Sequence, residues 1–136
     1  MKSSLEGTGK FILRVAFGCL MLVHGVQKVS KYSDLVEAFP DPIGLGSQLS
    51  LISAIATELG CSIFLILGLL TRVVSVPLAF TMIIALFVVH ADDPWQKKEL
   101  AAVYLVAYIA ILFLGPGKFS IDHLIWGKRA DSLTSP

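Results

Sequence analysis

The chain has 136 residues, of which 55% are apolar and 15% are charged, and its 11 basic and 10 acidic residues give a net charge of +1. Soluble domains are about 45–50% apolar and about 25% charged, whereas nucleic-acid-binding domains carry a strong basic excess. The composition therefore excludes disordered, collagen-like and nucleic-acid-binding chains, and the mean hydropathy of +0.78 indicates that lipid covers much of the surface.

Four apolar stretches predict that a single domain over residues 1–136 crosses the membrane four times. A helix needs about 17–25 apolar residues to cross the bilayer core, and none of these stretches alternates as barrel strands do. Arg14 inside the first stretch, with no small-residue cleavage site after it, argues against a signal peptide. The predicted fold class is all-α, a membrane four-helix bundle with a long outer loop between helices 1 and 2 and a short C-terminal amphipathic helix. The predicted spans are about residues 11–27, 49–70, 73–91 and 100–115.

Basic residues predict the orientation, because short cytoplasmic segments carry an excess of Lys and Arg. Seven basic residues lie on the side of both termini and four on the other side, so we expect cytoplasmic termini and name that side the inner one. The inner residues are Lys2, Lys10, Arg14, Arg72, Lys118, Lys128 and Arg129, and the outer ones are Lys28, Lys31, Lys97 and Lys98.

The connections between the spans are predicted to differ in length. Only Thr71-Arg72 is expected to link the second and third spans, which makes these helices antiparallel neighbours. In the long outer loop, Ser33 or Asp34 is expected to cap a short helix that Pro40 ends.

Ionisable residues inside the spans are the best indicators of function, since each costs about 2.5–3.5 kcal/mol to insert. Glu58 lies about 13 Å below the outer boundary at 1.5 Å per residue. It is either an acid that handles protons or binds a ligand, or an acid that pairs with a basic partner. His24, Lys28 and His90 lie near the outer side, and the bundle could bring them to Glu58 around an outward-facing pocket. The helical spacing of a metal site is absent, so no metal is predicted.

Arg14 has two interpretations, because it lies near the inner end of the first span. It extends to the cytoplasmic interface, or it reaches inward toward Glu58. Arg72 is interpreted as a determinant of topology.

Small residues are predicted to pack between the helices. Cys19 and Cys61 differ too much in depth for a disulfide and are interpreted as buried packing residues. Four glycines are predicted as close contacts between helices, namely Gly18, Gly25, Gly60 and Gly68.

The chain's end carries turn and cap residues. Gly115-Pro116-Gly117 is expected to end the fourth span. Ser120 is expected to cap the short terminal helix, with Asp122 in its first turn. That helix is predicted to dock at the inner interface, and residues 131–136 are predicted to be disordered.

These positions together resemble the DoxX family of small membrane proteins. The resemblance runs from about Leu13 to Asp122. It rests on Arg14, His24-Gly25 with Lys28, Glu58-Leu59-Gly60, Leu67-Gly68-Leu69-Leu70-Thr71-Arg72 and Gly115-Pro116-Gly117-Lys118-Phe119-Ser120-Ile121-Asp122. It implies a four-helix protein of the bacterial cytoplasmic membrane, related to a subunit of a thiosulfate:quinone oxidoreductase, and it supplies no established catalytic residues.

Three functions follow as hypotheses. The first is a small subunit or accessory of a quinone-linked membrane oxidoreductase, with quinone as the ligand and a membrane or soluble redox protein as partner. No cluster-type cysteine spacing, haem motif or nucleotide loop is present, so the electron carrier would be quinone or a partner's cofactor. The second is a non-enzymatic assembly factor or scaffold. The third is a transporter, which would require a homo-oligomer because four spans form a narrow bundle.

Overall fold

The computed structural model describes residues 1–127 and 129, and every regular element within them is helical. This confirms the all-α fold class. Residues 131–136, which were predicted to be disordered, lie outside the described part of the chain. The α-helices are α1 (Lys2–Ser30), α2 (Tyr32–Leu35), α3 (Ser47–Ile55), α4 (Ser62–Leu67), α5 (Thr71–Ile84) and α6 (Trp95–Leu114), and three segments are π-helical, η1 (Ala56–Cys61), η2 (Ala85–Val89) and η3 (His123–Gly127).

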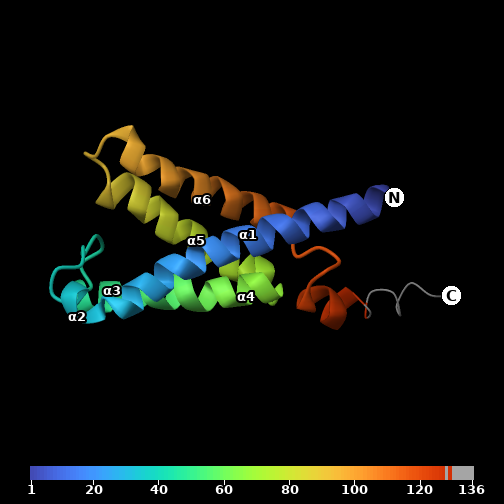
Figure 1. Ribbon diagram of the computed structural model, residues 1–136, viewed down its shortest axis with the longest axis horizontal. Helices are drawn as coiled ribbons and strands as arrows, with labels where there is room; N and C mark the ends of the chain where they lie inside the picture. The colour runs from blue at the N-terminus through green and yellow to red at the C-terminus, as the bar shows by residue number, and fades with distance from the viewer. Residues whose placement is uncertain (128, 130–136) are drawn as a thin grey trace.

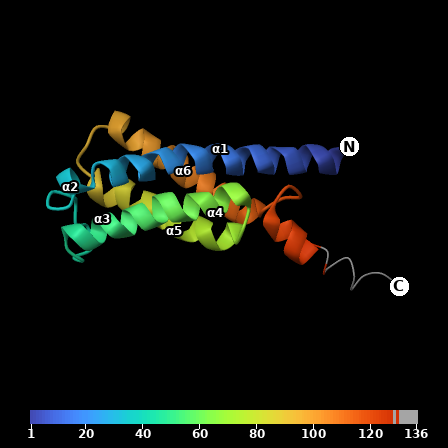
Figure 2. The same cartoon turned by 60° about the horizontal axis from the view of Figure 1, so that its bottom comes forward.

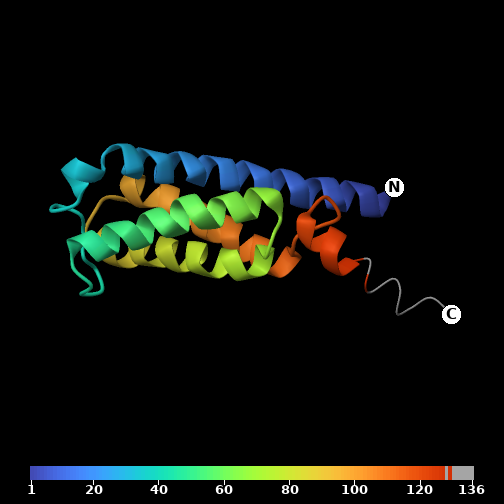
Figure 3. The ribbon, with the colours of Figure 1, turned by 90° about the horizontal axis from the view of Figure 1, so that it is seen from below.

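The long helices lie side by side in an elongated molecule (Figures 1 and 3). α3, η1 and α4 follow one another as a continuous rod beside α1, and α5 with η2 packs against α6. The N-terminus and the last described residues lie at one end, which we name the terminal end. The loops at residues 31–46 and 90–94 lie at the other, the loop end (Figure 2).

Three of the helices are long and apolar enough to cross a membrane, namely Lys2–Ser30, Ser47–Leu67 and Thr71–Val89. They match the first three predicted spans, although α1 begins nine residues before the predicted start at residue 11. An ion pair of 2.7 Å between Lys10 and Glu6, one turn apart, supports that extension. The fourth helix, α6, is less apolar at its start because it opens with Trp95-Gln96-Lys97-Lys98-Glu99.

The core lies between the rods, where large apolar side chains from different helices are fully buried. Met21, Leu65, Leu78, Tyr108 and Ile111 are each at most 1% exposed. The outward faces of the same helices carry apolar residues too, including Val106 at 68% and Phe113 at 77%. A surface of this kind is covered by lipid rather than by water.

Two glycines allow α1 to approach the second rod closely. A Cβ atom at Gly25 would lie 2.8 Å from the Leu59 nitrogen, and one at Gly18 would lie 2.7 Å from the Ile66 side chain. These two predictions are confirmed. The prediction for Gly60 is wrong, because no atom lies within 4 Å of its Cβ position.

The cysteine prediction is wrong in part. Both thiols are free, but Cys19 is exposed on the outside of α1 and Cys61 is half-buried. Cys61 packs against the core but is only partly buried, and Cys19 is not a core residue.

The connection between α4 and α5 consists of Gly68-Leu69-Leu70. The predicted link, Thr71-Arg72, already belongs to α5. Gly68 has φ of +70° and ends α4 in the left-handed conformation. Gly115 and Gly117 both have φ of +77° and end α6, as predicted.

The loop helix α2 exists, but its predicted cap is wrong. The helix begins at Tyr32 after Lys31, so Ser33 and Asp34 lie within its turn and make no capping hydrogen bond. Its last helical residue is Leu35, five residues before Pro40.

Candidate functional site

An ion pair inside the helices is the centre of the candidate site. Lys28 Nζ lies 2.6 Å from Glu58 Oε2, and the two side chains are 23% and 7% exposed. Lys28 comes from the last turn of α1 and Glu58 from η1. Gly25, one turn before Lys28, lets the α1 backbone lie directly on residues 58 and 59. The sequence left two interpretations of Glu58 open, and the structure shows the one in which the acid pairs with a basic residue.

A π-helical segment interrupts the α3–α4 rod, and another follows α5. Glu58 lies within η1, and η2 follows α5 near the loop end. A π-helical turn holds an additional residue and rotates the side chains that follow, and such segments are frequent at functional sites. The hydrophobic pattern of the sequence gave no sign of them, because one extra residue per turn barely alters an apolar run.

A cavity of about 430 Å³ lies beside the ion pair. Its lining comes from α1, the 31–46 loop, the α3–η1 rod and the α5–η2 rod, and it includes Lys28, Glu58 and His90. Apolar side chains make up most of the wall, among them Phe39, Ile43, Phe80, Met82 and Val89. A largely apolar cavity with few polar groups is typical of a small-molecule site. We name it the loop-end pocket.

The loop that covers this pocket is organised by Asp41. Its carboxylate accepts hydrogen bonds from the backbone nitrogens of Leu45 at 2.8 Å and Gly46 at 2.9 Å, and from the Ser50 hydroxyl at 3.0 Å. The hydrogen bond from Gly46, together with the others, lowers the pKa of Asp41 below its ordinary value. Sequence reasoning missed this residue, although an Asp between two prolines is a common turn former.

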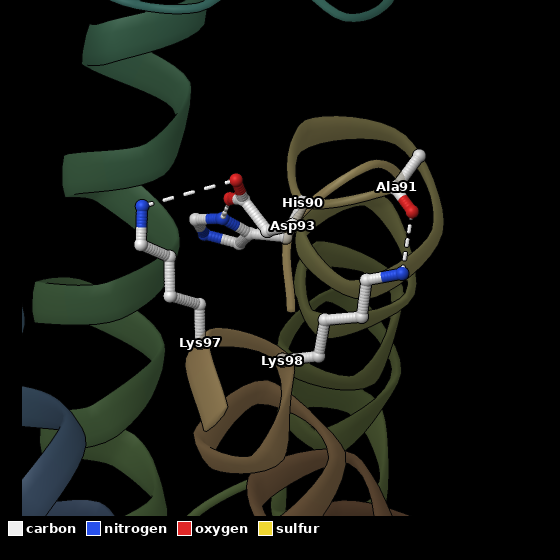
Figure 4. A network of polar contacts seen from close by, with 5 residues as sticks. All are labelled: His90, Ala91, Asp93, Lys97 and Lys98. Atoms are coloured by element: carbon white, nitrogen blue, oxygen red, sulfur yellow. Dashed lines mark hydrogen bonds and ion pairs between the residues drawn. The ribbon is translucent and has the colours of Figure 1, made fainter. Parts of the chain in front are cut away.

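His90 lines the pocket but is held by its own loop (Figure 4). Its Nδ1 lies 2.7 Å from Asp93 Oδ2, and Lys97 Nζ lies 3.8 Å from the other carboxylate oxygen. The hydrogen bond to His90 lowers the pKa of Asp93, and Lys97 and Lys98 act in the same direction. Lys98 also donates to the carbonyl of Ala91.

The fourth predicted residue, His24, lies elsewhere. Its ring forms a T-shaped pair with Tyr104 at 5.8 Å between centroids, and Tyr104 stacks on Tyr108 at 5.9 Å. His24 is not part of the lining of the loop-end pocket. The structure therefore brings Lys28, Glu58 and His90 to one cavity and places His24 in an aromatic cluster. The four-residue spacing of the two tyrosines was the sequence signal for that cluster.

The terminal end holds a second polar cluster, in which Arg14 is central. Arg14 is only 1% exposed and donates to the carbonyls of Leu65 at 2.8 Å, Ile66 at 2.6 Å and Phe119. The interpretation that Arg14 reaches inward toward Glu58 is wrong, because the guanidinium is buried against the end of α4 and Glu58 pairs with Lys28. The last carbonyls of α4 have no partner within the helix, and a cation is favoured at that end.

Asp122 completes the same cluster. Its carboxylate accepts hydrogen bonds from the backbone nitrogens of Leu70 at 2.7 Å and Thr71 at 2.8 Å, which are the unpaired donors at the start of α5. Gly68 has no room for a side chain, because a Cβ atom would lie 2.5 Å from Arg14 Nη1 and from Ser120 Cβ. Arg14, Gly68, Ser120 and Asp122 thus join three distant segments, and we name them the terminal-end cluster.

Ser120 and Arg72 also form hydrogen bonds at the ends of helices. Ser120 Oγ accepts a hydrogen bond from the His123 nitrogen at 3.1 Å, which confirms the predicted cap. Arg72 donates from Nε to the Leu112 carbonyl at 3.1 Å and from Nη2 to the Phe113 carbonyl at 3.4 Å, at the end of α6. Within residues 1–127 and 129, no group of three or more His, Cys, Asp or Glu side chains is placed to hold a metal ion.

Comparison with known proteins assigns the chain to a family. The DoxX family model matches residues 9–91, which include Arg14, Lys28 and Glu58 and end before Gly115–Asp122. A Bacillus subtilis protein named "Putative oxidoreductase CatD" is 29% identical over 99% of this chain and 100% of its own length. No solved structure matches the chain.

Two other relatives carry less specific names. An uncharacterised protein of Haemophilus influenzae is 27% identical over 88% of this chain and 85% of its own length. An uncharacterised membrane protein of Mycobacterium tuberculosis is 30% identical over 87% of this chain and 81% of its own length. With its apolar helices, this chain belongs to the DoxX family and is a membrane protein.

Proposed function

We propose that the chain binds the head group of a quinone in the loop-end pocket and serves as a small subunit or accessory of a quinone-linked membrane oxidoreductase. The observation that carries this proposal is the Lys28–Glu58 ion pair in the wall of an otherwise largely apolar cavity of about 430 Å³. The name of the Bacillus subtilis relative supports a redox connection.

The lining suits a quinone in two respects. The ring and tail are apolar and match Phe80, Met82 and Val89, while each ring carbonyl needs a hydrogen-bond donor, and the Lys28 ammonium is a charged one. When bound, a quinone supplies two-electron, two-proton chemistry. The contribution of this chain is to place an ammonium donor and a carboxylate beside the ring, while a partner redox protein supplies the electrons.

We further propose that α6 also crosses the bilayer, so that the chain forms a four-helix bundle in the bacterial inner membrane. Its apolar part, residues 100–114, is short, and the exposed Val106 and Phe113 lie on it. Both termini then lie on the cytoplasmic side, as the distribution of basic residues predicts.

A second candidate function, a non-enzymatic assembly factor or scaffold, is favoured by the completeness of the same ion pair. Glu58 is buried and accepts directly from Lys28, so under this function the pair serves only to hold α1 against η1. Under this function the pair stabilises the fold, and a co-purified protein, without a small ligand, is the expected partner.

Titration of the protein in nanodiscs with a short-chain ubiquinone tests the proposal, with solvent extraction and native mass spectrometry of the gently solubilised sample. Lys28→Met removes a charge-assisted hydrogen bond, which is about 1.5–3 kcal/mol, so we expect binding at least about tenfold weaker. Glu58→Gln is expected to remove quinone-dependent turnover in the assembled complex. The matched control is Lys10→Met with Glu6→Gln, because that pair has the same residue types and a similar distance of 2.7 Å at the other end of α1.

A charge-exchanged variant separates the two functions. Lys28→Glu combined with Glu58→Lys restores an ion pair, so folded yield should return in either case. If the pair is a scaffold element, partner binding returns as well. If it recognises quinone, quinone affinity stays low because the donor has moved. Equal quinone binding by the wild type and by Lys28→Met, or none by the wild type, contradicts the proposal.

A further inference from the structure

A second cavity, of about 540 Å³, opens at the terminal end between the start of α1, the start of α5 and the segment after α6. It takes no part in the proposed quinone site, because it lies at the opposite end of the rods. Its lining includes three basic side chains, Lys10, Arg72 and Lys118, and two acidic ones, Glu6 and Asp122. His123 also lines it.

The two acids are already engaged. Glu6 is paired with Lys10 at 2.7 Å, and both carboxylate oxygens of Asp122 accept backbone hydrogen bonds at the start of α5. Arg72 donates to carbonyl oxygens of α6, and Lys118 Nζ donates to the Ser3 hydroxyl at 3.1 Å. Among the described residues, neither Arg72 nor Lys118 forms an ion pair. The lining thus holds three cations and two anions, an excess of one positive charge, and Lys118 also interacts electrostatically with Glu6.

One polar group in the lining has no hydrogen-bond partner among the described residues. Thr71 is fully buried, and within the described chain its hydroxyl has no hydrogen-bond partner. A buried polar group without a partner is costly, but this hydroxyl is closed to solvent, so the site proposed below does not depend on it.

The cations lie beside apolar residues at the level where helices end. α4 ends at Leu67, α5 begins at Thr71 and α6 ends at Leu114. Next to them in the lining, Leu70 is 41%, Val73 is 62% and Trp126 is 47% exposed. Basic pockets between membrane helices at head-group depth bind anionic lipids, and Trp is favoured at that depth.

We propose that this cavity is a binding site for one anionic phospholipid. The phosphodiester lies against Arg72 and Lys118, and the acyl chains follow the exposed apolar face beside Leu70 and Val73. The shared chemistry is that of a phosphate anion, and the adjoining lipid-facing surface favours a lipid over a soluble phosphate.

Titration with phosphatidylglycerol tests this site in the full-length protein carrying Trp95→Phe. The chain has two tryptophans, so this change leaves Trp126, a lining residue, as the fluorescent probe. We expect a saturable change of its fluorescence and a one-to-one lipid adduct by native mass spectrometry, with phosphatidylcholine giving neither. A basic residue at a lipid surface contributes about 1 kcal/mol, so Lys118→Gln should weaken binding about fivefold.

Matched variants and a competitor define the outcomes. Lys2→Gln removes the same charge at the same end of the molecule but outside the cavity lining, and it should bind as the wild type does. Arg72→Gln should weaken binding at least as much as Lys118→Gln; if it does not fold, Lys118→Gln alone decides. Unchanged binding in Lys118→Gln, or an equal loss in Lys2→Gln, overturns the site. Displacement of the lipid by millimolar inorganic phosphate shows a soluble-anion site and also overturns the proposal.

Discussion

The two ends of the molecule use their buried charges differently. At the terminal end, Arg14 and Asp122 bind backbone groups, namely carbonyls at the end of α4 and nitrogens at the start of α5. At the loop end, Lys28 and Glu58 bind each other beside a cavity. A backbone group cannot change its charge, whereas a pair of side chains can be opened by a ligand. The comparison indicates that the terminal end holds the fold and that the loop end is available for chemistry.

The largest effect is expected from replacement of Arg14, which should reduce the amount of folded protein. Arg14→Met removes a donor from three carbonyls. The Leu65 carbonyl keeps a hydrogen bond from the Gly68 nitrogen at 3.1 Å, and each buried carbonyl left without a partner costs about 1–3 kcal/mol. We expect the folded fraction in mild detergent to collapse, as measured by size-exclusion chromatography and thermal unfolding. Lys10→Met, one turn earlier on α1, should leave the elution profile nearly unchanged, because its partner Glu6 is largely exposed. A well-folded Arg14→Met protein would contradict the structural role.

A smaller effect is expected where α1 touches η1. Gly25→Ala places a methyl group 2.8 Å from the Leu59 nitrogen, and overpacking of this kind costs about 1–3 kcal/mol. The shift should separate Lys28 from Glu58 and weaken any ligand at the loop end. Gly9→Ala is the control on the same helix, because no atom lies within 4 Å of its Cβ position. That control should gain up to about 1 kcal/mol of helix stability. Equal unfolding temperatures for the two variants would refute the close contact.

The smallest effect is expected from acid at the loop end. The folded-state pKa of Asp41 is lowered, chiefly by the hydrogen bond from Gly46. The stabilisation is therefore fully present above the ordinary pKa of 3.8 and is lost as the pH falls through the lower folded-state value. Hydrogen exchange at Leu45 and Gly46, corrected for the intrinsic rate, should lose protection only below about pH 4. Asp41→Asn should show little protection at any pH, and protection equal to that of the wild type would exclude the proposed role.

The sequence predicted features that depend on local pattern. Apolar runs placed the first three spans, and the absence of a side chain at Gly18 and Gly25 marked helix contacts. Ser120 was found as a cap because its partner is only three residues away. The partners of Arg14 and Asp122 lie 51 to 105 residues away in the chain. Such contacts depend on how the rods assemble, so their residue types could be noticed but their roles could not be assigned.

The candidate site was predicted to the same limited extent. Lys28 and Glu58 stood out because charges are costly in a membrane, and the structure pairs them directly. His24 was grouped with them by its four-residue spacing from Lys28, but the approach of α6 places Tyr104 against its ring. The loop held by Asp41 and the two π-helical segments depend on backbone geometry, which apolar periodicity does not encode.

The terminal-end cluster also has a consequence for biosynthesis. Arg14 is among the first residues to leave the ribosome, yet one of its acceptors is Phe119, 105 residues later. Protein synthesis adds about 5–20 residues per second, so the Phe119 carbonyl is made roughly 5–20 s after Arg14. During translation the first helix therefore enters the bilayer before the acceptors of Arg14 are complete, and the insertion machinery or lipid phosphates must accommodate its charge until Phe119 is made.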